Sequence, residues 1–211
     1  LEIFSSAFLS STEREKPFEI SNTATRHMGE IKFVTEEYNI TQSKLSLGFT
    51  TETTILDKDE QAMNMMCLLF GGAPFSKLFL NVREKLSLCY YCSSAYDHAK
   101  GTIFVNSGVE TENRDKAQNE ILNQLEKMQN GEVSDEELMN ARRLVANSYT
   151  GIEDSISRLE SFFLTRYLSD IDTTPEKELE ARLAVTKEEI IDAARKVKLN
   201  TVYFMKPKEE N

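Results

Sequence analysis

The sequence predicts an α+β fold in which helices cover one face of a largely antiparallel sheet. Two patterns support this prediction: short segments in which apolar and polar residues alternate, and longer segments in which apolar residues recur at helical spacing. Their order is the third observation. Two strands come first, then two helices, two further strands, a run of helices and a final strand, and this grouping is typical of the α+β class.

The first two predicted strands lie at residues 30–34 and 43–49, where apolar and polar residues alternate. In the second, Leu45, Leu47 and Phe49 fall on one face, which is the pattern of a strand with one buried side. We expect these two strands to form an antiparallel pair.

Two helices and a hairpin are expected next. An apolar stripe at residues 62–69 predicts the first helix, residues 75–86 resume helical spacing, and the glycines at 71–72 separate the two. Residues 88–96 and 102–109 are rich in aromatic and β-branched side chains and are joined by a short polar loop. This arrangement predicts a β-hairpin.

The remainder of the chain is predicted to be helical up to a closing strand at residues 201–205. One helix covers residues 117–128, and the apolar stripe of the next continues from Leu138 to Phe162, which indicates one long helix. Two shorter helices follow. The start and stop signals are Gly131 after the first helix, the Ser134/Glu137 capping box, the Thr174-Pro175 pair and the Thr186/Glu189 box.

Composition limits the classes of partner. The 211 residues carry a formal charge of −10, so a nucleic acid or an anionic membrane would meet a repulsive field. The longest apolar run, residues 65–70, is far shorter than the roughly 18 residues that indicate a membrane span. We therefore expect no nucleic-acid and no membrane partner. The odd number of cysteines, three, fits a reducing compartment, and the expected location is the cytoplasm.

The domain organisation expected is one domain over residues 1–211, since no repeat or shift in composition divides the chain. Residues 1–20 are expected to be the end of a preceding helix and a connector, because Ile3, Phe4, Ala7 and Phe8 have helical spacing before a polar stretch. The absence of an initiator methionine adds to this expectation. The sequence thus indicates a fragment of a longer chain.

Motifs for self-contained chemistry are scarce. His27 and His98 are the only histidines, so no zinc motif with two histidines in one helical turn can form, and we expect no metal or cofactor in this chain. Cys89 and Cys92 have the spacing of a redox motif, but residues three apart on a regular strand point to opposite faces. Buried cysteines are therefore favoured over a dithiol centre. The glycines at 71–72 lack the spacing of phosphate-binding loops.

The most specific pattern reads FGGAPFSKLF at residues 70–79 and VREKLSLCY at residues 82–90. It resembles the C-terminal halves of insulin-degrading enzyme, pitrilysin and the mitochondrial-processing-peptidase relatives, in which a glycine-rich turn leads through Ser-(Arg/Lys)-Leu-Phe into Arg-Glu-Lys-x-x-x-x-Tyr. The interval of seven from Arg83 to Tyr90 matches. The order of elements also agrees from about residue 30 to the end of the chain. Ala73, Pro74 and Ser87 depart from the residues usual in the family.

This resemblance implies a processing-peptidase-like fold and a division of labour. Such enzymes form a clamshell of two related halves, one with an inverted zinc motif and the other with an Arg/Tyr pair that reaches across the chamber. By motif match that pair is Arg83 and Tyr90. A tyrosine hydroxyl can donate to the oxyanion of a tetrahedral intermediate, and a guanidinium can hold a substrate carbonyl or carboxylate.

The resemblance therefore implies that the chain is the non-zinc half of an insulinase-like metallopeptidase. Its substrate would be a peptide, its partner a homologous half that holds the zinc, and the chain alone would be inactive. The alternative is an inert structural or assembly subunit with the same fold. Without the resemblance, Arg83 is a surface helix charge and Tyr90 a strand residue that packs in the core.

Overall fold

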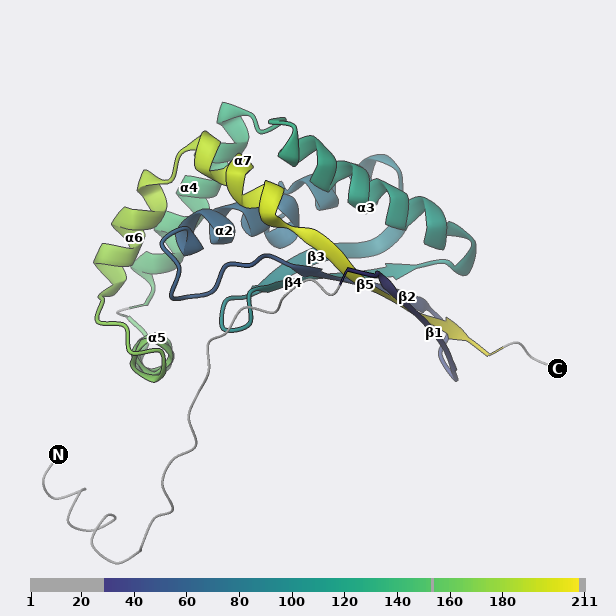
Figure 1. Cartoon of the computed structure of the whole chain (residues 1–211), viewed down its shortest axis with the longest axis horizontal. Coiled ribbons are helices and arrows are strands. Elements are labelled where there is room, and N and C mark those ends of the chain that lie inside the picture. The colour runs from purple at the N-terminus through teal and green to yellow at the C-terminus, as the bar shows by residue number, and fades with distance from the viewer. Residues whose placement is uncertain (1–28, 153, 209–211) are drawn as a thin grey trace, which may run out of the picture.

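A five-stranded sheet under a layer of helices forms the body of this computed structural model, which describes residues 29–152 and 154–208 (Figure 1). The sheet order is β1-β5-β2-β4-β3. The strands are β1 (Lys32–Tyr38), β2 (Ser43–Thr50), β3 (Cys89–Asp97), β4 (Thr102–Val109) and β5 (Lys198–Pro207). Residues 1–20 and His27, on which the sequence analysis made predictions, lie outside the described residues.

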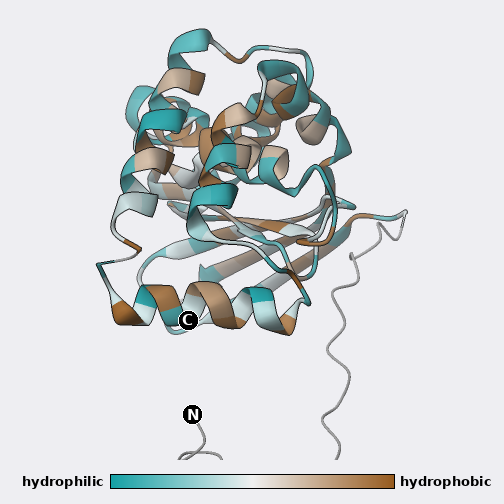
Figure 2. Ribbon diagram, turned by 90° about the vertical axis from the view of Figure 1, so that its left-hand side faces the viewer, coloured by the Kyte–Doolittle hydropathy of each residue, from teal (hydrophilic) through white to brown (hydrophobic). Residues whose placement is uncertain are grey.

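The helices stack over one face of the sheet, whereas α5 lies apart from the others (Figures 1 and 2). This arrangement confirms the predicted α+β class with one covered face. The helices are α2 (Glu60–Cys67), the π-helical η1 (Leu68–Gly72) and η2 (Leu78–Lys85), the 3-10 turn η3 (Thr111–Asn113), α3 (Arg114–Gln129), α4 (Asp135–Thr150), α5 (Ile156–Leu168), α6 (Pro175–Ala184) and α7 (Lys187–Lys196).

The expected pairing of the first two strands is wrong, because β5 lies between them. β5 is antiparallel to β2 and parallel to β1, so that Val202 pairs with Leu47 on one side and with Phe33 on the other. The helix-facing Val202 and Phe204 are buried, whereas most of β1 is exposed. Burial of its apolar face thus favours an inner position for β5 and leaves the polar β1 at the edge.

The core fills the space between the sheet and the helices. Leu45 and Leu47 of β2 and Ile103 and Val105 of β4 have no exposed surface, and they face the apolar side chains of the helical layer. Figure 2 shows hydrophobic residues on the strands and inner helical turns and mostly hydrophilic residues on the outer turns. Burial of this apolar surface is the main favourable contribution to folding.

The predicted helix signals are confirmed. Ser134 Oγ accepts from the Glu137 N–H at 3.1 Å while the Ser134 N–H donates to Glu137 Oε2 at 2.7 Å, which is the predicted capping box. Gly131 has φ +94°, a left-handed conformation that glycine adopts without steric cost. The predicted long helix is wrong, however, since the chain breaks at Gly151 into α4 and α5. The apolar stripe continues across the break, but the helix does not.

Candidate functional site

Arg83 and Tyr90 line the same cavity, which has a volume of about 430 Å³ and lies where η2 ends and β3 begins. The structure thus brings together the two residues that the sequence analysis singled out. We call this cavity the Arg83–Tyr90 pocket. Its lining consists of Arg83, Glu84, Ser87, Leu88, Cys89, Tyr90, Glu110 and Asn113.

A tight reversal of the chain after η2 positions the pair. The Ser87 N–H donates to the Arg83 carbonyl and the Leu88 N–H to the Val82 carbonyl, each at 3.1 Å. Ser87 itself has φ +49°, in the left-handed region that favours glycine. This conformation gives a physical reason why glycine is common at this position in the family that the sequence resembles, and the serine here retains the same turn.

Arg83 lies at the rim of the pocket with 40% of its side chain exposed. Its guanidinium packs over the Phe79 ring, 4.7 Å from the ring centre, and Arg83 Nη1 lies 3.4 Å from Glu84 Oε1. An ion pair this exposed contributes little to stability. The guanidinium is therefore accessible for contacts with a ligand that enters the pocket.

Tyr90 is 58% exposed, so the interpretation that places it in the core is wrong. Its hydroxyl donates a hydrogen bond to Glu110 Oε1, at the end of β4. This hydrogen bond to a carboxylate raises the pKa of Tyr90 above its usual value. The side chain is consequently a protonated hydrogen-bond donor at neutral pH.

Cys89 and Cys92 point to the same face of the sheet, so the predicted opposite orientation is wrong. Cys89 pairs with Val109 and Cys92 with Ser107, which places four residues of β3 against three of β4. The extra residue is a β-bulge between Cys89 and Tyr91. Cys92 is buried, whereas Cys89 is half-buried and lines the pocket.

The sequence analysis missed Glu110 and Asn113 as pocket residues. Both lie just beyond β4, and the hairpin prediction contained a signal for them. Continuing the antiparallel pairing of Asp97 with Thr102 back along the hairpin brings the start of β3 beside the end of β4. A carboxylate at that end is therefore expected near Tyr90.

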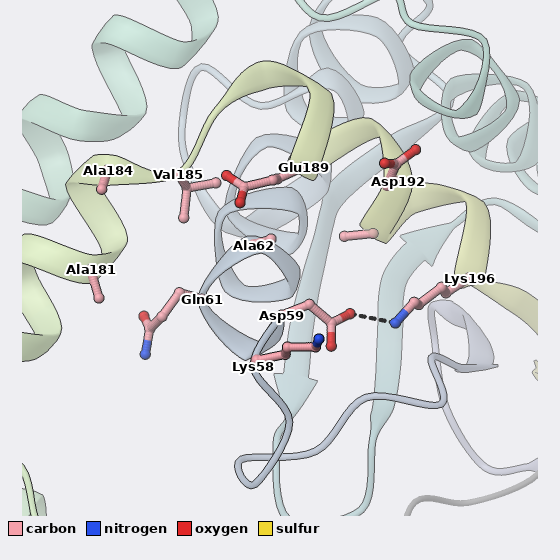
Figure 3. Close-up of a pocket in the computed structure, with 11 residues that line it drawn as sticks. Lys58, Asp59, Gln61, Ala62, Ala181, Ala184, Val185, Glu189, Asp192 and Lys196 are labelled. Atoms are coloured by element: carbon pink, nitrogen blue, oxygen red, sulfur yellow. Dashed lines mark hydrogen bonds and ion pairs between the residues drawn. The ribbon is translucent and has the colours of Figure 1, made fainter.

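A second cavity, of about 450 Å³, lies between α2, α6 and α7 (Figure 3). Lys196 Nζ donates to Asp59 Oδ2 at 2.5 Å in this cavity, and Glu189 accepts from the backbone N–H of Thr186 in the capping box. These charged side chains are therefore already paired or hydrogen-bonded within the protein. None of the predicted site residues lies here, so the Arg83–Tyr90 pocket is the candidate site.

The described residues contain no group of three or more His, Cys, Asp or Glu side chains arranged to hold a metal ion. In the same part of the chain, every helix is too short or too polar to cross a membrane.

Gly71 has a packing role, because a Cβ there would come within 2.6 Å of the Ser94 backbone nitrogen. Gly71 thus lets η1 lie directly against β3.

Comparison with known proteins gives consistent matches. The family profile described as "Peptidase M16 inactive domain" matches residues 4–145. "Probable inactive metalloprotease YmfF" of Bacillus subtilis is 36% identical over 178 residues, which cover 84% of this chain and 42% of that protein. The chain therefore spans less than half the length of this relative.

Two solved structures share the fold. A conserved protein from Enterococcus faecalis V583 has a TM-score of 0.83 and 30% identity, over 90% of this chain and 45% of that one. A protease from Helicobacter pylori has a TM-score of 0.81 and 18% identity, over 98% of this chain and 51% of that one. At 18% identity the likeness to the Helicobacter pylori protease concerns the fold alone.

Proposed function

Because the chain belongs to the peptidase M16 family, as its inactive domain, we propose that it is the non-zinc half of an insulinase-like metallopeptidase. In this role it contributes Arg83 and Tyr90 to a peptide-degrading chamber that a zinc-bearing half completes. The observation that supports this proposal is that both head groups are accessible in one pocket, although seven positions separate the residues in sequence. A purely structural role does not require that arrangement.

Tyr90 is the proposed donor to the oxyanion that forms when the scissile carbonyl is attacked. Its hydroxyl is protonated at neutral pH, and it is held at the mouth of the pocket through Glu110. In the reaction the hydroxyl gives up its hydrogen bond to the Glu110 carboxylate and donates to the developing oxyanion instead. A positioned donor of this kind strengthens its hydrogen bond as negative charge develops, which lowers the barrier selectively.

Arg83 is the proposed substrate-binding group. Its guanidinium presents several N–H donors in a fixed plane, which suits a peptide carbonyl or a terminal carboxylate. The Phe79 ring supports the guanidinium from one side and limits its freedom. The described residues hold no group of three or more side chains arranged to bind zinc. We assign the metal to the partner half, where it would polarise the carbonyl and activate water.

A second candidate function is an inert structural or assembly subunit. The Bacillus subtilis relative is named a probable inactive metalloprotease, and the Tyr90 hydroxyl is occupied by Glu110 in the chain described here. In this candidate, Tyr90 and Arg83 never meet a substrate. Removing either head group then leaves the activity of the assembled enzyme unchanged.

The proposal also covers the setting of the chain. We propose that residues 1–211 are one insulinase-like domain, with a homologous zinc-bearing half in the same polypeptide or in a separate subunit. An H-x-x-E-H motif with a downstream glutamate in the flanking sequence or in a neighbouring gene product identifies that half. Cytoplasmic location remains part of the proposal, supported by three cysteines that are all free thiols.

The isolated chain is expected neither to hydrolyse peptides nor to retain zinc, because in this proposal the zinc and the water it activates belong to the partner half. Metal analysis after dialysis against zinc and a fluorogenic peptide assay measure both properties. The denatured chain serves as the blank for zinc that binds non-specifically. Stoichiometric zinc together with robust turnover by the isolated chain would overturn the proposal.

A further inference from the structure

The Arg83–Tyr90 pocket is lined by one cysteine of a thiol pair that the proposed peptidase function does not use. Cys89 lines the pocket, and Cys92 lies behind it on the same face of β3 because of the bulge. Both cysteines are free thiols. The third, Cys67, is buried elsewhere in the core beside Ser94, where its Sγ lies 3.2 Å from Ser94 Oγ. The thiols therefore differ in access to solvent.

Two side chains next to Cys89 can donate hydrogen bonds to a thiolate. Cys92 lies on the same face of β3, Ser107 is the β4 residue paired with Cys92, and both side chains lower the pKa of Cys89. Ser107 Oγ is buried and has no hydrogen-bond partner among the described residues. A thiolate at Cys89 would offer an acceptor to this hydroxyl and to the Cys92 thiol.

The charges facing Cys89 come from each element around the pocket. η2 provides Arg83 and Glu84, and Glu110 stands at the end of β4. The Cys92 side chain, followed by Ser107 and the positive charge of Arg83, lowers the pKa of Cys89 below its usual value, against the effect of burial. Burial instead raises the pKa of Cys67 to about 11.

We propose that Cys89 is a thiol-exchange site at which a low-molecular-weight disulfide modifies the pocket. The Cys89 thiolate attacks one sulfur of the disulfide, a new sulfur–sulfur bond forms at Cys89, and the original bond of the reagent breaks. The other half leaves as a thiolate, which takes up a proton. The reagent disulfide is the oxidant, so no further electron acceptor is needed.

The adduct occupies the cavity into which Arg83 and Tyr90 project. Such a group blocks access to both head groups, so that modification switches the pocket off and reduction restores it. This consequence rests on the proposed peptidase function. The reactivity of Cys89 does not, because it depends only on contacts within this chain.

The test uses 4,4′-dithiodipyridine, an aromatic disulfide, on the folded 211-residue chain. We expect a fast release of about one pyridinethione per chain, since only an accessible thiolate reacts quickly. Mass spectrometry with fragmentation is expected to locate the adduct on Cys89. Cys89→Ser is expected to abolish the fast phase, whereas Cys67→Ala retains it.

The pH profile tests the mechanism. The thiolate is the nucleophile, so the rate is expected to be low at acidic pH and to rise with a midpoint below that of an ordinary thiol, because the pKa of Cys89 is lowered. Cys92→Ala removes a donor and is expected to raise this midpoint toward that of an ordinary thiol, about 8.5. Cys92→Ser keeps a donor, and its midpoint is expected to stay low.

Three outcomes would overturn the proposal. The first is that Cys89 reacts no faster than Cys67, and the second is that the product lacks the adduct mass. The third is that the pH profiles of Cys92→Ala and Cys92→Ser have the same midpoint while circular dichroism shows both variants folded. Because these measurements need no peptidase activity, they test the thiol site independently of the proposed function. An inactive assembly with a reactive Cys89 refutes only the function, and an active assembly with an inert Cys89 refutes only the thiol site.

Discussion

Tyr90→Phe in the complete, zinc-loaded enzyme is expected to lower kcat by a factor of about 10² to 10³, the usual loss when one oxyanion donor is removed. The ring remains, and the side chain is largely exposed, so the fold does not depend on the hydroxyl. Zinc content and assembly are therefore expected to stay unchanged. Steady-state hydrolysis of a fluorogenic peptide, normalised to zinc content, measures the effect.

Tyr91→Phe is the matched control, because it removes the same atom from the neighbouring residue. Tyr91 lies away from the pocket, against Gly108, where a Cβ would come within 2.6 Å of the Tyr91 ring. We expect its kcat to remain near that of the wild type. If Tyr90→Phe and Tyr91→Phe hydrolyse peptide equally well in assembled enzymes, the inert-subunit candidate is favoured.

Glu178→Ala is expected to lower the free energy of unfolding by about 3–5 kcal/mol, because it leaves the largely buried Arg166 guanidinium without its counter-charge. Arg166 Nε donates to Glu178 Oε1 at 2.7 Å and Arg166 Nη2 to Glu178 Oε2 at 2.5 Å. The Tyr149 hydroxyl also donates to this carboxylate, at 3.3 Å. Urea denaturation followed by circular dichroism measures the loss.

The same substitution is expected to loosen α5. Phe162 is the buried residue of this helix, and Arg166, one turn later, ties it to α6 through Glu178. Hydrogen exchange in residues 156–168 is expected to accelerate more than in α7. Glu180→Ala, an exposed change on the same helix as Glu178, is the control. A loss below 1 kcal/mol, about that of an exposed ion pair, would contradict the role given to this pair.

Local signals in the sequence predicted most of the elements. The capping boxes at Ser134 and Thr186 fix where α4 and α7 begin, because they satisfy backbone N–H groups within one turn. The alternation from Leu45 to Phe49 likewise determined which side of β2 is buried. These features depend on residues close together in the chain, so a single sequence contains them.

The features that were missed depend on distant contacts or on a single irregular residue. The place of β5 between β1 and β2 follows from packing of the C-terminal Val202 against the helical layer, which no local pattern encodes. The bulge beside Tyr90 turns Cys89 and Cys92 to one face. Glu110 reaches Tyr90 from the other strand of the hairpin. Motif spacing found Arg83 and Tyr90 but not the groups that orient them.

The most direct measurement is peptide hydrolysis by the zinc-bearing half as this chain is added. With wild-type chain, hydrolysis is expected to rise and saturate as the complex forms. With Tyr90→Phe it is expected to saturate at the same chain concentration but at a rate lower by a factor of about 10² to 10³. Hydrolysis that is the same with either chain, or that needs no added chain, would contradict a role for this domain in the chemistry.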